Sequence, residues 1–399
     1  MRRPFVFSKE NMIINTQWRR LTGRFDAAMI NKTEASELLK PTYAQRGFLP
    51  EDDPLTAFPH GSRYAMLDEI GHDLPSLLYN KDFRVYAREL EIPRWQGPVN
   101  EENLPQLRLY YVRLGFLASA YVNQVGEEPV KLLPYNIAVP LARAAMLLER
   151  LPILSYDGYA LYNWKRFHKH QPIRLGNIDT LQSFVHLYDE HWFILVHVEI
   201  EAIAADILAA IASIKCKLTE SAEADLSPEL WHIEGAVRRQ VEVLKRIPEH
   251  MSASLYYKTF RPYIRFFENI TYEGVDQAPI QFRGETGAQS SIMPTLVAFM
   301  KVPHQRSVLT DHLMDMRKYM PLRHQVLIKE VEAMPDIRNS RYKEPYNAIL
   351  DAMAAFRRVH YGWAEEYITR WTDDPRGTGG TPYMQWLKQM LQETEAHRL

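Results

Sequence analysis

His360 is the residue whose type and position predict the most specific chemistry in this chain. It lies in the stretch 344–371, where large apolar side chains recur at steps of three and four, the spacing of one inward face of a helix. An imidazole there is either a core histidine bonded to a neighbouring carbonyl group or an axial ligand for haem iron in an apolar cavity. Arg357 precedes it by about one turn and can reach an acidic group of the same cofactor.

His197 repeats this pattern in the predicted helix 193–214. Phe193, His197, Ile200 and Ala204 follow one another at steps of four, three and four, so Phe193 and His197 face the same pocket. Two inward histidines on separate helices favour a functional site, although two satisfied core histidines explain the spacing equally well.

Arg261 is surrounded by the aromatic residues Tyr256, Tyr257 and Phe260. This arrangement suits an aromatic substrate that carries a carboxylate, because a guanidinium group matches the geometry of a carboxylate. The competing interpretation is a surface arginine whose aliphatic stem packs against the protein.

Two segments rich in small residues lie beside the predicted helices. The run 376–381, Arg-Gly-Thr-Gly-Gly-Thr, follows the His360 helix. Its N–H groups and hydroxyls can close over a ligand, or the run is a flexible linker before the last helix, 383–391. The turn 284–291, Gly-Glu-Thr-Gly-Ala-Gln-Ser-Ser, leads into a helix that Ser290 or Ser291 can cap. Neither segment matches a dinucleotide-binding or phosphate-binding motif.

The composition indicates a globular protein of a reducing compartment. Of the 399 residues, 46% are hydrophobic and 24% charged, and the formal net charge is -1. This balance gives no basic footprint for nucleic acid or an anionic membrane. Cys216 is the only cysteine, which excludes a disulfide framework and a thiolate metal cage. A non-haem metal site at Glu190 and His191, with His186 nearby, is disfavoured because the spacing is not that of a zinc-binding helix.

Targeting and membrane segments are not evident in the sequence. The N-terminal residues lack an apolar core of signal-peptide length. Glu199, Glu201 and Asp206 interrupt the longest apolar stretch, 192–214, which therefore reads as a core helix rather than a membrane span. We expect a cytoplasmic protein that binds neither nucleic acid nor membranes.

The order of the predicted elements is that of a mainly α fold with two unequal parts. Residues 1–164 are predicted to form a smaller, mostly helical N-terminal domain, in which frequent prolines before residue 100 keep helices short. An irregular connector, 165–184, leads to a large all-helical domain, 185–399, that can enclose a flat cofactor. Helices are predicted over 106–122, 136–151, 193–214, 229–247, 291–300, 309–319, 321–333, 344–371 and 383–391.

Taken in order, these pieces make the chain resemble the indoleamine 2,3-dioxygenase family of haem proteins. The resemblance spans about residues 105 to 391, and the first hundred residues match weakly. The most specific matches are Gly-Thr-Gly-Gly-Thr at 377–381 and Asn-Ile-Ala-Val-Pro at 136–140. The others are Leu-Pro-Tyr at 133–135, Leu-Pro-Ile-Leu-Ser-Tyr at 151–156, Asn163-Trp164, 193–201, Arg261, 284–291, Met-Arg-Lys-Tyr-Met-Pro at 316–321, and Arg357 with His360.

The resemblance implies a large helical domain that holds haem b. His360 would be the proximal iron ligand, and Arg357 would pair with a haem propionate. Gly284 and Glu285 would also contact the cofactor.

For the substrate side, the resemblance implies Phe193 and Tyr256 over the distal pocket and Arg261 as the partner of the substrate carboxylate. The remaining substrate contacts would be Tyr156 and Tyr159 on the far wall, Thr286 and Gly287 at the rim, and Thr378, Gly379, Gly380 and Thr381 in a closing loop.

Two residues depart from the family pattern. His197 stands where many members of the family have a small hydroxyl residue. A histidine at this position is similar to the tryptophan 2,3-dioxygenases, in which a distal histidine accepts the indole N–H. A shift of two residues would put Leu195 there instead. Tyr256 replaces the usual phenylalanine and makes the pocket more polar. We therefore identify the chain as a bacterial-type member with some tryptophan 2,3-dioxygenase-like character, whose substrate is tryptophan or a modified indole.

The implied reaction is the opening of the indole 2,3 bond of L-tryptophan or a related indole by O2, giving an N-formylkynurenine-type product. Haem b is the expected cofactor, and an indole amino acid and O2 are the expected partners. His197 would orient the indole N–H. The alternatives are a haem enzyme that rearranges or monooxygenates a substituted tryptophan, and a non-catalytic haem-binding protein. The glycine loop and Arg261 argue against the latter, because a sensor for a diatomic gas needs neither. The sequence carries no signal for an oligomeric state.

Overall fold

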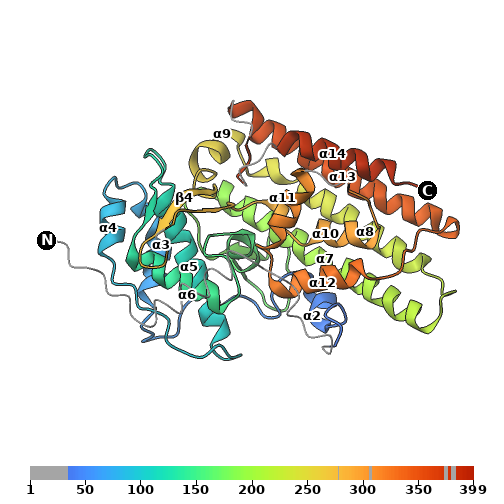
Figure 1. The fold of residues 1–399 in the computed structure, drawn as a ribbon, viewed down its shortest axis with the longest axis horizontal. Coiled ribbons are helices and arrows are strands. Elements are labelled where there is room, and N and C mark those ends of the chain that lie inside the picture. Colours follow the sequence, from blue (N-terminus) through green and yellow to red (C-terminus); the bar gives the residue numbers. More distant parts are fainter. Residues whose placement is uncertain (1–34, 277, 305–307, 373–375, 379–382) are drawn as a thin grey trace.

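A computed structural model describes residues 35–276, 278–304, 308–372, 376–378 and 383–399. Helices dominate it, which confirms the predicted mainly α fold. Figure 1 shows an elongated molecule with the helices of residues 66–147 at one end and a bundle of long C-terminal helices at the other.

The N-terminal part contains five helices among the described residues. They are α2 (Pro41–Arg46), α3 (Met66–Leu77), α4 (Phe83–Glu89), α5 (Leu104–Val122) and α6 (Tyr135–Leu147). Helices α2 and α4 have six and seven residues, as the prolines predicted, whereas α3 has 12 residues and includes Pro75. From Leu109 to Val122 every residue of α5 is buried, so this helix is the centre of its part of the molecule rather than an amphipathic surface helix.

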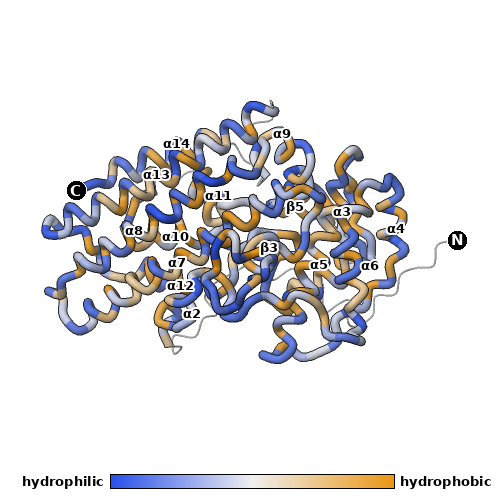
Figure 2. The backbone as a smooth tube through the Cα atoms, turned by 180° about the vertical axis from the view of Figure 1, so that it is seen from behind, coloured by the Kyte–Doolittle hydropathy of each residue, from blue (hydrophilic) through white to orange (hydrophobic). Residues whose placement is uncertain are grey.

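Eight helices described in the C-terminal part form the bundle. They are α7 (Tyr188–Glu220), α8 (Ser227–Leu244), α9 (Ala253–Leu255), α10 (Ile292–Phe299), α11 (Val308–Arg317), α12 (Leu322–Glu332), α13 (Lys343–Tyr367) and α14 (Tyr383–Ala396). Helix α8 packs against both α7 and α13, and α14 lies along α13 (Figure 1). Along α13 and α14 apolar residues alternate with hydrophilic ones, as expected for helices with one buried face (Figure 2).

Short strands tie the two parts together. Strand β1 (Leu132–Leu133) pairs in parallel with β4 (Phe267–Tyr272), which pairs antiparallel with β5 (Ile280–Phe282). The strands β2 (Trp164–Arg166) and β3 (Ile178–Thr180) form an antiparallel pair. Strands β4 and β5 fall within 185–399, which we expected to be entirely helical. They were not foreseen because β4 finds one of its partners more than a hundred residues away in the chain, and local periodicity carries no sign of such pairing.

Two hydrophobic clusters fill the interior, and each draws residues from both parts of the chain. The first surrounds α5 and α6 and includes Leu195 of α7 and Tyr272 of β4. The second lies among α7, α8, α10, α12 and α13 and includes Tyr43 and Phe48. The parts on either side of 165–184 therefore share their cores, and the domain limits proposed from the sequence stay a prediction.

Gly47 fixes the N-terminal segment against α7. Its φ is +64°, and a Cβ atom there would lie 2.1 Å from the carbonyl oxygen of Glu201, so only glycine fits.

No helix in the described part of the chain has the length and apolar character needed to cross a membrane.

Candidate functional site

His360 lies in the C-terminal half of α13, near enough to His197 of α7 for a charge on that ring to affect its pKa. The His360 side chain has a large accessible surface. Protein atoms nevertheless surround it, and this burial, followed by the charges of His197 and Arg357, lowers its pKa to about 4. A side chain has both an accessible surface and a lowered pKa when it faces a space that the protein encloses, and we infer such a hollow at His360. No hydrogen bond to the His360 ring is found among the described residues. The imidazole is therefore neutral at pH 7 and has a free nitrogen lone pair, unlike a core histidine bonded to a carbonyl group.

His197 approaches the same space from α7. Its Nδ1 lies 2.7 Å from the carbonyl oxygen of Phe193. A carbonyl oxygen only accepts, so Nδ1 carries the proton. Burial lowers the pKa of His197, so the ring stays neutral and Nε2 keeps its lone pair. Leu195, the alternative in the shifted alignment, is buried in the first hydrophobic cluster.

A continuous aromatic wall adjoins His197. The ring centroids of Phe193 and Tyr156 lie 4.6 and 5.9 Å from that of His197. The rings of Tyr256 and Tyr159 lie 5.5 and 6.3 Å from that of Phe193. The structure thus brings together five of the residues that the sequence assigned to the substrate side.

Two π-helical turns carry Tyr159 and Tyr256, and Tyr156 directly precedes the first of them. One is Asp157–Leu161, which contains Tyr159, and the other is Tyr256–Phe260. In the second, the backbone N–H of Arg261 donates to the carbonyl oxygen of Tyr256 at 3.1 Å. A π turn holds one residue more than an α turn and occurs frequently at functional sites. Here it directs a tyrosine and the following arginine to the same region.

Arg261 is a buried cation with an unused donor. Its side chain is 5% exposed, its Nη2 donates to the carbonyl oxygen of Arg376 at 3.5 Å, and its guanidinium lies 5.1 Å from the ring centre of Tyr257. The Nε atom is buried without a hydrogen-bond partner in the described part of the structure. The positive charge of Arg261 also opposes the effect of burial, which raises the pKa of Tyr256 to about 12. This side chain is available for a carboxylate.

The turn 284–291 is fixed against the wall by close packing and by an amide side chain. A Cβ atom on Gly284 would lie 2.3 Å from the carbonyl oxygen of Ile264, so the close approach requires glycine. Gln289 donates to the carbonyl oxygen of Gly284 and accepts from the backbone N–H of Tyr156, both at 2.9 Å. Glu285, at 2% exposure, is held by a backbone hydrogen bond to Ile264 at 3.0 Å.

The next residues of the turn are less covered. Thr286 is half-buried, and its side chain accepts from the backbone N–H of Ala288 at 3.4 Å. Gly287 is exposed, and a Cβ atom there would meet nothing within 4 Å. Their expected place at the rim of the site stays a prediction.

Two buried glutamates support the tyrosines of the wall. Glu201 accepts from the hydroxyl of Tyr156 at 2.8 Å and from Ser290 at 2.6 Å, and Glu190 accepts from the hydroxyl of Tyr159 at 3.0 Å. Burial raises the pKa of each carboxyl group to about 7. Sequence reasoning missed these roles and treated Glu201 only as an interruption of an apolar stretch. A carboxyl group inside an apolar helix was the available signal.

Arg357 is buried beside His360 but points toward α14. Its Nη1 donates to the carbonyl oxygen of Met390 and, at 2.6 Å, to the hydroxyl of Thr394. Burial lowers its pKa to about 10. The expected pairing with a haem propionate stays a prediction.

Residues 376–378, the part of the glycine-rich run 376–381 that the structure describes, lie close to Arg261. The carbonyl oxygen of Arg376 accepts from Arg261, and Thr378 is buried. Gly379, Gly380 and Thr381, the rest of the expected closing loop, lie outside the described residues.

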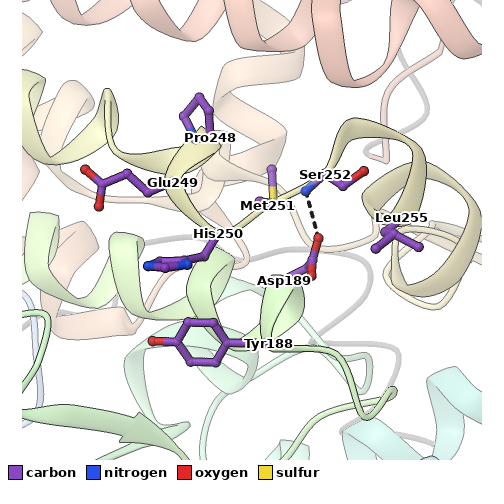
Figure 3. Close-up of a pocket in the computed structure, with 8 residues that line it drawn as sticks. All are labelled: Tyr188, Asp189, Pro248, Glu249, His250, Met251, Ser252 and Leu255. Atoms are coloured by element: carbon purple, nitrogen blue, oxygen red, sulfur yellow. Dashed lines mark hydrogen bonds between the residues drawn. The ribbon is translucent and has the colours of Figure 1, made fainter.

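A separate hollow opens on the surface near the start of α7 (Figure 3). Its volume is ≈ 460 Å³, and it is lined by Tyr188, Asp189 and the segment 248–255. The backbone N–H of Ser252 donates to Asp189 at 2.7 Å across it. None of the predicted site residues lines this hollow.

The residues around His360 fit a haem group in their chemistry. A neutral imidazole with a free lone pair is an iron ligand, and the aromatic wall offers apolar surface to a macrocycle. In the part of the chain that the structure describes, no group of three or more histidine, cysteine, aspartate or glutamate side chains is arranged to hold a metal ion by itself.

Comparison with known proteins gives a consistent result. The family model described as "Indoleamine 2,3-dioxygenase" matches residues 42–376. The chain is 27% identical to rat indoleamine 2,3-dioxygenase 1 (Rattus norvegicus) over 86% of its own length and 91% of the relative's. It is 27% identical to indoleamine 2,3-dioxygenase of Saccharomyces cerevisiae, with 88% and 91% covered. It is 24% identical to a 6-hydroxytryptophan 2,3-dioxygenase of Fusarium equiseti, with 86% and 93% covered.

Proposed function

The chain belongs to the indoleamine 2,3-dioxygenase family, a family of haem-dependent dioxygenases, and from this membership we propose its reaction. The protein opens the indole 2,3 bond of L-tryptophan or a related indole amino acid with O2, giving an N-formylkynurenine-type product. The observation that carries the proposal is His360, an imidazole near the aromatic wall that is neutral at pH 7 and has no hydrogen bond among the described residues.

His360 is the proposed iron ligand. When bound, haem b supplies the iron centre at which O2 is activated. The low pKa of His360 keeps one ring nitrogen unprotonated at neutral pH, so the imidazole can bind the metal without first losing a proton. Arg357 neighbours the ligand, and its proposed propionate contact needs a rotation away from Thr394. Gly284 is proposed to contact the cofactor through its backbone.

His197 orients the substrate ring. Its Nδ1–H is used by Phe193, so Nε2 is an acceptor, the property needed to receive an indole N–H. Phe193, Tyr156, Tyr159 and Tyr256 enclose the ring with aromatic surface.

Arg261 binds the carboxylate of the substrate. A buried guanidinium whose Nε–H has no partner among the described residues forms a strong charge-assisted hydrogen bond with such a group. Thr286 and Gly287 line the rim, and the segment 378–381 closes the site in this proposal. Holding both the ring and the amino-acid end restricts the substrate to a reactive orientation and excludes water.

Formation of a product distinguishes a dioxygenase from a protein that binds haem without catalysing a reaction. The experiment is an absorption spectrum of the purified ferrous protein in the presence of O2, before and after addition of L-tryptophan, followed by identification of the product. A ring-opened kynurenine-type product supports the proposal. A stable oxygen complex with unchanged L-tryptophan contradicts it, and a hydroxylated or rearranged indole would indicate the monooxygenase alternative.

A ring-hydroxylated tryptophan is the second candidate substrate. One relative is named for 6-hydroxytryptophan, and Tyr256 places a hydroxyl group on the wall of the site. The comparison of kcat/KM for L-tryptophan and 6-hydroxy-L-tryptophan decides between them.

We propose the cytoplasm as the compartment because Cys216 is an exposed free thiol.

A further inference from the structure

Glu285 is a buried carboxyl group without a partner in the described structure. Its side chain is 2% exposed, and no hydrogen bond or ion pair to its carboxyl group is found among the described residues. Glu190 accepts hydrogen bonds through both carboxylate oxygens, and Glu201 accepts two through Oε1, while its Oε2 has no partner in the described structure. A buried polar group left unsatisfied costs free energy, so Glu285 is better explained by a ligand than by stability.

Glu285 lies near the tyrosines of the substrate wall. Its charge raises the pKa of Tyr156, Tyr159 and Tyr256, so the carboxyl group is near all three. Arg261 acts on the same Tyr256 with the opposite sign. No ion pair joins Arg261 and Glu285 within the described residues. A cation and a carboxyl group, each available, thus border one aromatic wall.

We propose that Glu285 binds the α-ammonium group of the substrate while Arg261 binds its carboxylate. The inference rests on the proposed function, since a free amino acid is a zwitterion whose two charges need opposite partners. The ammonium–carboxylate contact is a charge-assisted hydrogen bond in a site with little water, where such contacts are strong. An ionised Glu285, the form that binds an ammonium group, would repel a haem propionate, so this role is an alternative to the cofactor contact predicted from the sequence, which stays a prediction.

The proposal carries a pH dependence. Burial raises the pKa of Glu285 to about 8, so the carboxyl group is largely protonated at pH 7 and must ionise to receive an ammonium group. Affinity for an amino acid therefore rises with pH up to about 8, whereas affinity for a ligand without the ammonium group does not. The titratable groups on which the charge of Glu285 acts are Tyr156, Tyr159 and Tyr256, and the charge of Arg261 acts on the last of these as well.

The test compares two ligands that differ only in this group. Dissociation constants of the haem-loaded ferric protein, which does not turn over, are measured calorimetrically for L-tryptophan and indole-3-propionate between pH 6.5 and 8.5. The wild type, Glu285→Gln and the control Glu242→Gln, whose side chain is 69% exposed, are compared. The wild type and control should prefer L-tryptophan, with a preference that grows by up to about tenfold per pH unit below pH 8.

In Glu285→Gln the preference should fall by about tenfold or more and lose its pH dependence, while affinity for indole-3-propionate and haem content stay unchanged. A pH dependence that persists in Glu285→Gln would come from Glu190 or Glu201 and would refute the proposal. Equal weakening of both ligands, or loss of haem, would make Glu285 a structural or cofactor residue. A wild type that binds and opens L-tryptophan without this dependence overturns the role of Glu285 alone. A wild type that binds neither indole overturns the proposed function as well.

Discussion

Burial, and then the charge that His197 carries when it is protonated, lowers the pKa of His360, although the two residues belong to α7 and α13. Both rings are neutral at pH 7, but they differ in their hydrogen bonds. His197 is tethered through Nδ1 to the carbonyl oxygen of Phe193, and His360 has no hydrogen bond among the described residues. The free ring is suited to bind a metal, and the tethered ring is suited to present one acceptor nitrogen in a fixed direction.

Replacement of His360 by alanine should abolish stable haem binding. The variant removes the proposed iron ligand from a hollow that otherwise keeps its aromatic wall. The measurement is the haem absorption band of the purified protein, before and after addition of free imidazole, which should restore part of the binding. His250→Ala, in the surface segment 248–255, is the control and should keep its haem. An intact band in His360→Ala would exclude the ligand role.

Replacement of Arg261 by alanine should weaken substrate binding without loss of haem. Removing one partner of a buried charge pair costs ~2–4 kcal/mol, which corresponds to a KM for L-tryptophan raised by roughly 30-fold to 1000-fold. The control is Arg238→Ala, whose side chain is 60% exposed on α8. If haem content falls together with affinity, Arg261 is structural, since its contacts with Tyr257 and Arg376 would then be the ones that matter.

Replacement of His197 by alanine should reduce discrimination between L-tryptophan and 1-methyl-L-tryptophan. Only the former can donate its ring N–H to Nε2 of His197. Loss of that hydrogen bond, worth ~1–2 kcal/mol, should lower kcat/KM for L-tryptophan by roughly 5-fold to 30-fold and leave the methylated ligand nearly unaffected. An unchanged ratio between the two substrates would show that the indole N–H is oriented by another group.

The sequence predicted the helices of the bundle because their apolar periodicity is local. The predicted 106–122 and 344–371 correspond to α5 (Leu104–Val122) and to α13 (Lys343–Tyr367) with the short turn Thr369–Trp371. The inward direction of His197 and His360 followed from the same periodicity, since one turn of helix fixes which residues share a face.

Other features of the site depend on contacts that local sequence does not encode. The pairing of Tyr156 with Glu201 and the tie between Tyr156 and Gln289 join segments far apart in the chain. The π turn at Tyr256–Phe260 has no periodic signature, because it adds one residue to a helix. The direction of Arg357 was not predictable either, since it is set by hydrogen bonds to α14.

The stability of the protein should fall as pH rises from 7 to 8.5. Glu285 titrates near pH 8 in the folded protein, against 4.5 for an ordinary glutamate. Between these values the folded state keeps a proton that the unfolded state has lost. Stability is therefore full below about pH 4.5 and is lost progressively until the folded carboxyl group has ionised, at up to about 1.4 kcal/mol per pH unit for one group. Glu190 and Glu201 act in the same direction, with pKa values of about 7.

The Glu285 contribution can be isolated with the variants Glu285→Gln and Glu242→Gln. The free energy of unfolding is obtained from urea titrations at pH 7, 7.5, 8 and 8.5. Glutamine cannot ionise, so Glu285→Gln should lose less stability over this range than the wild type, whereas Glu242→Gln should follow the wild type. The histidines contribute little here, because the lowered pKa of His360 and the ordinary value of 6.5 both lie below the range. Equal slopes in all three proteins would mean that Glu285 is already ionised at pH 7 and that burial does not hold its proton.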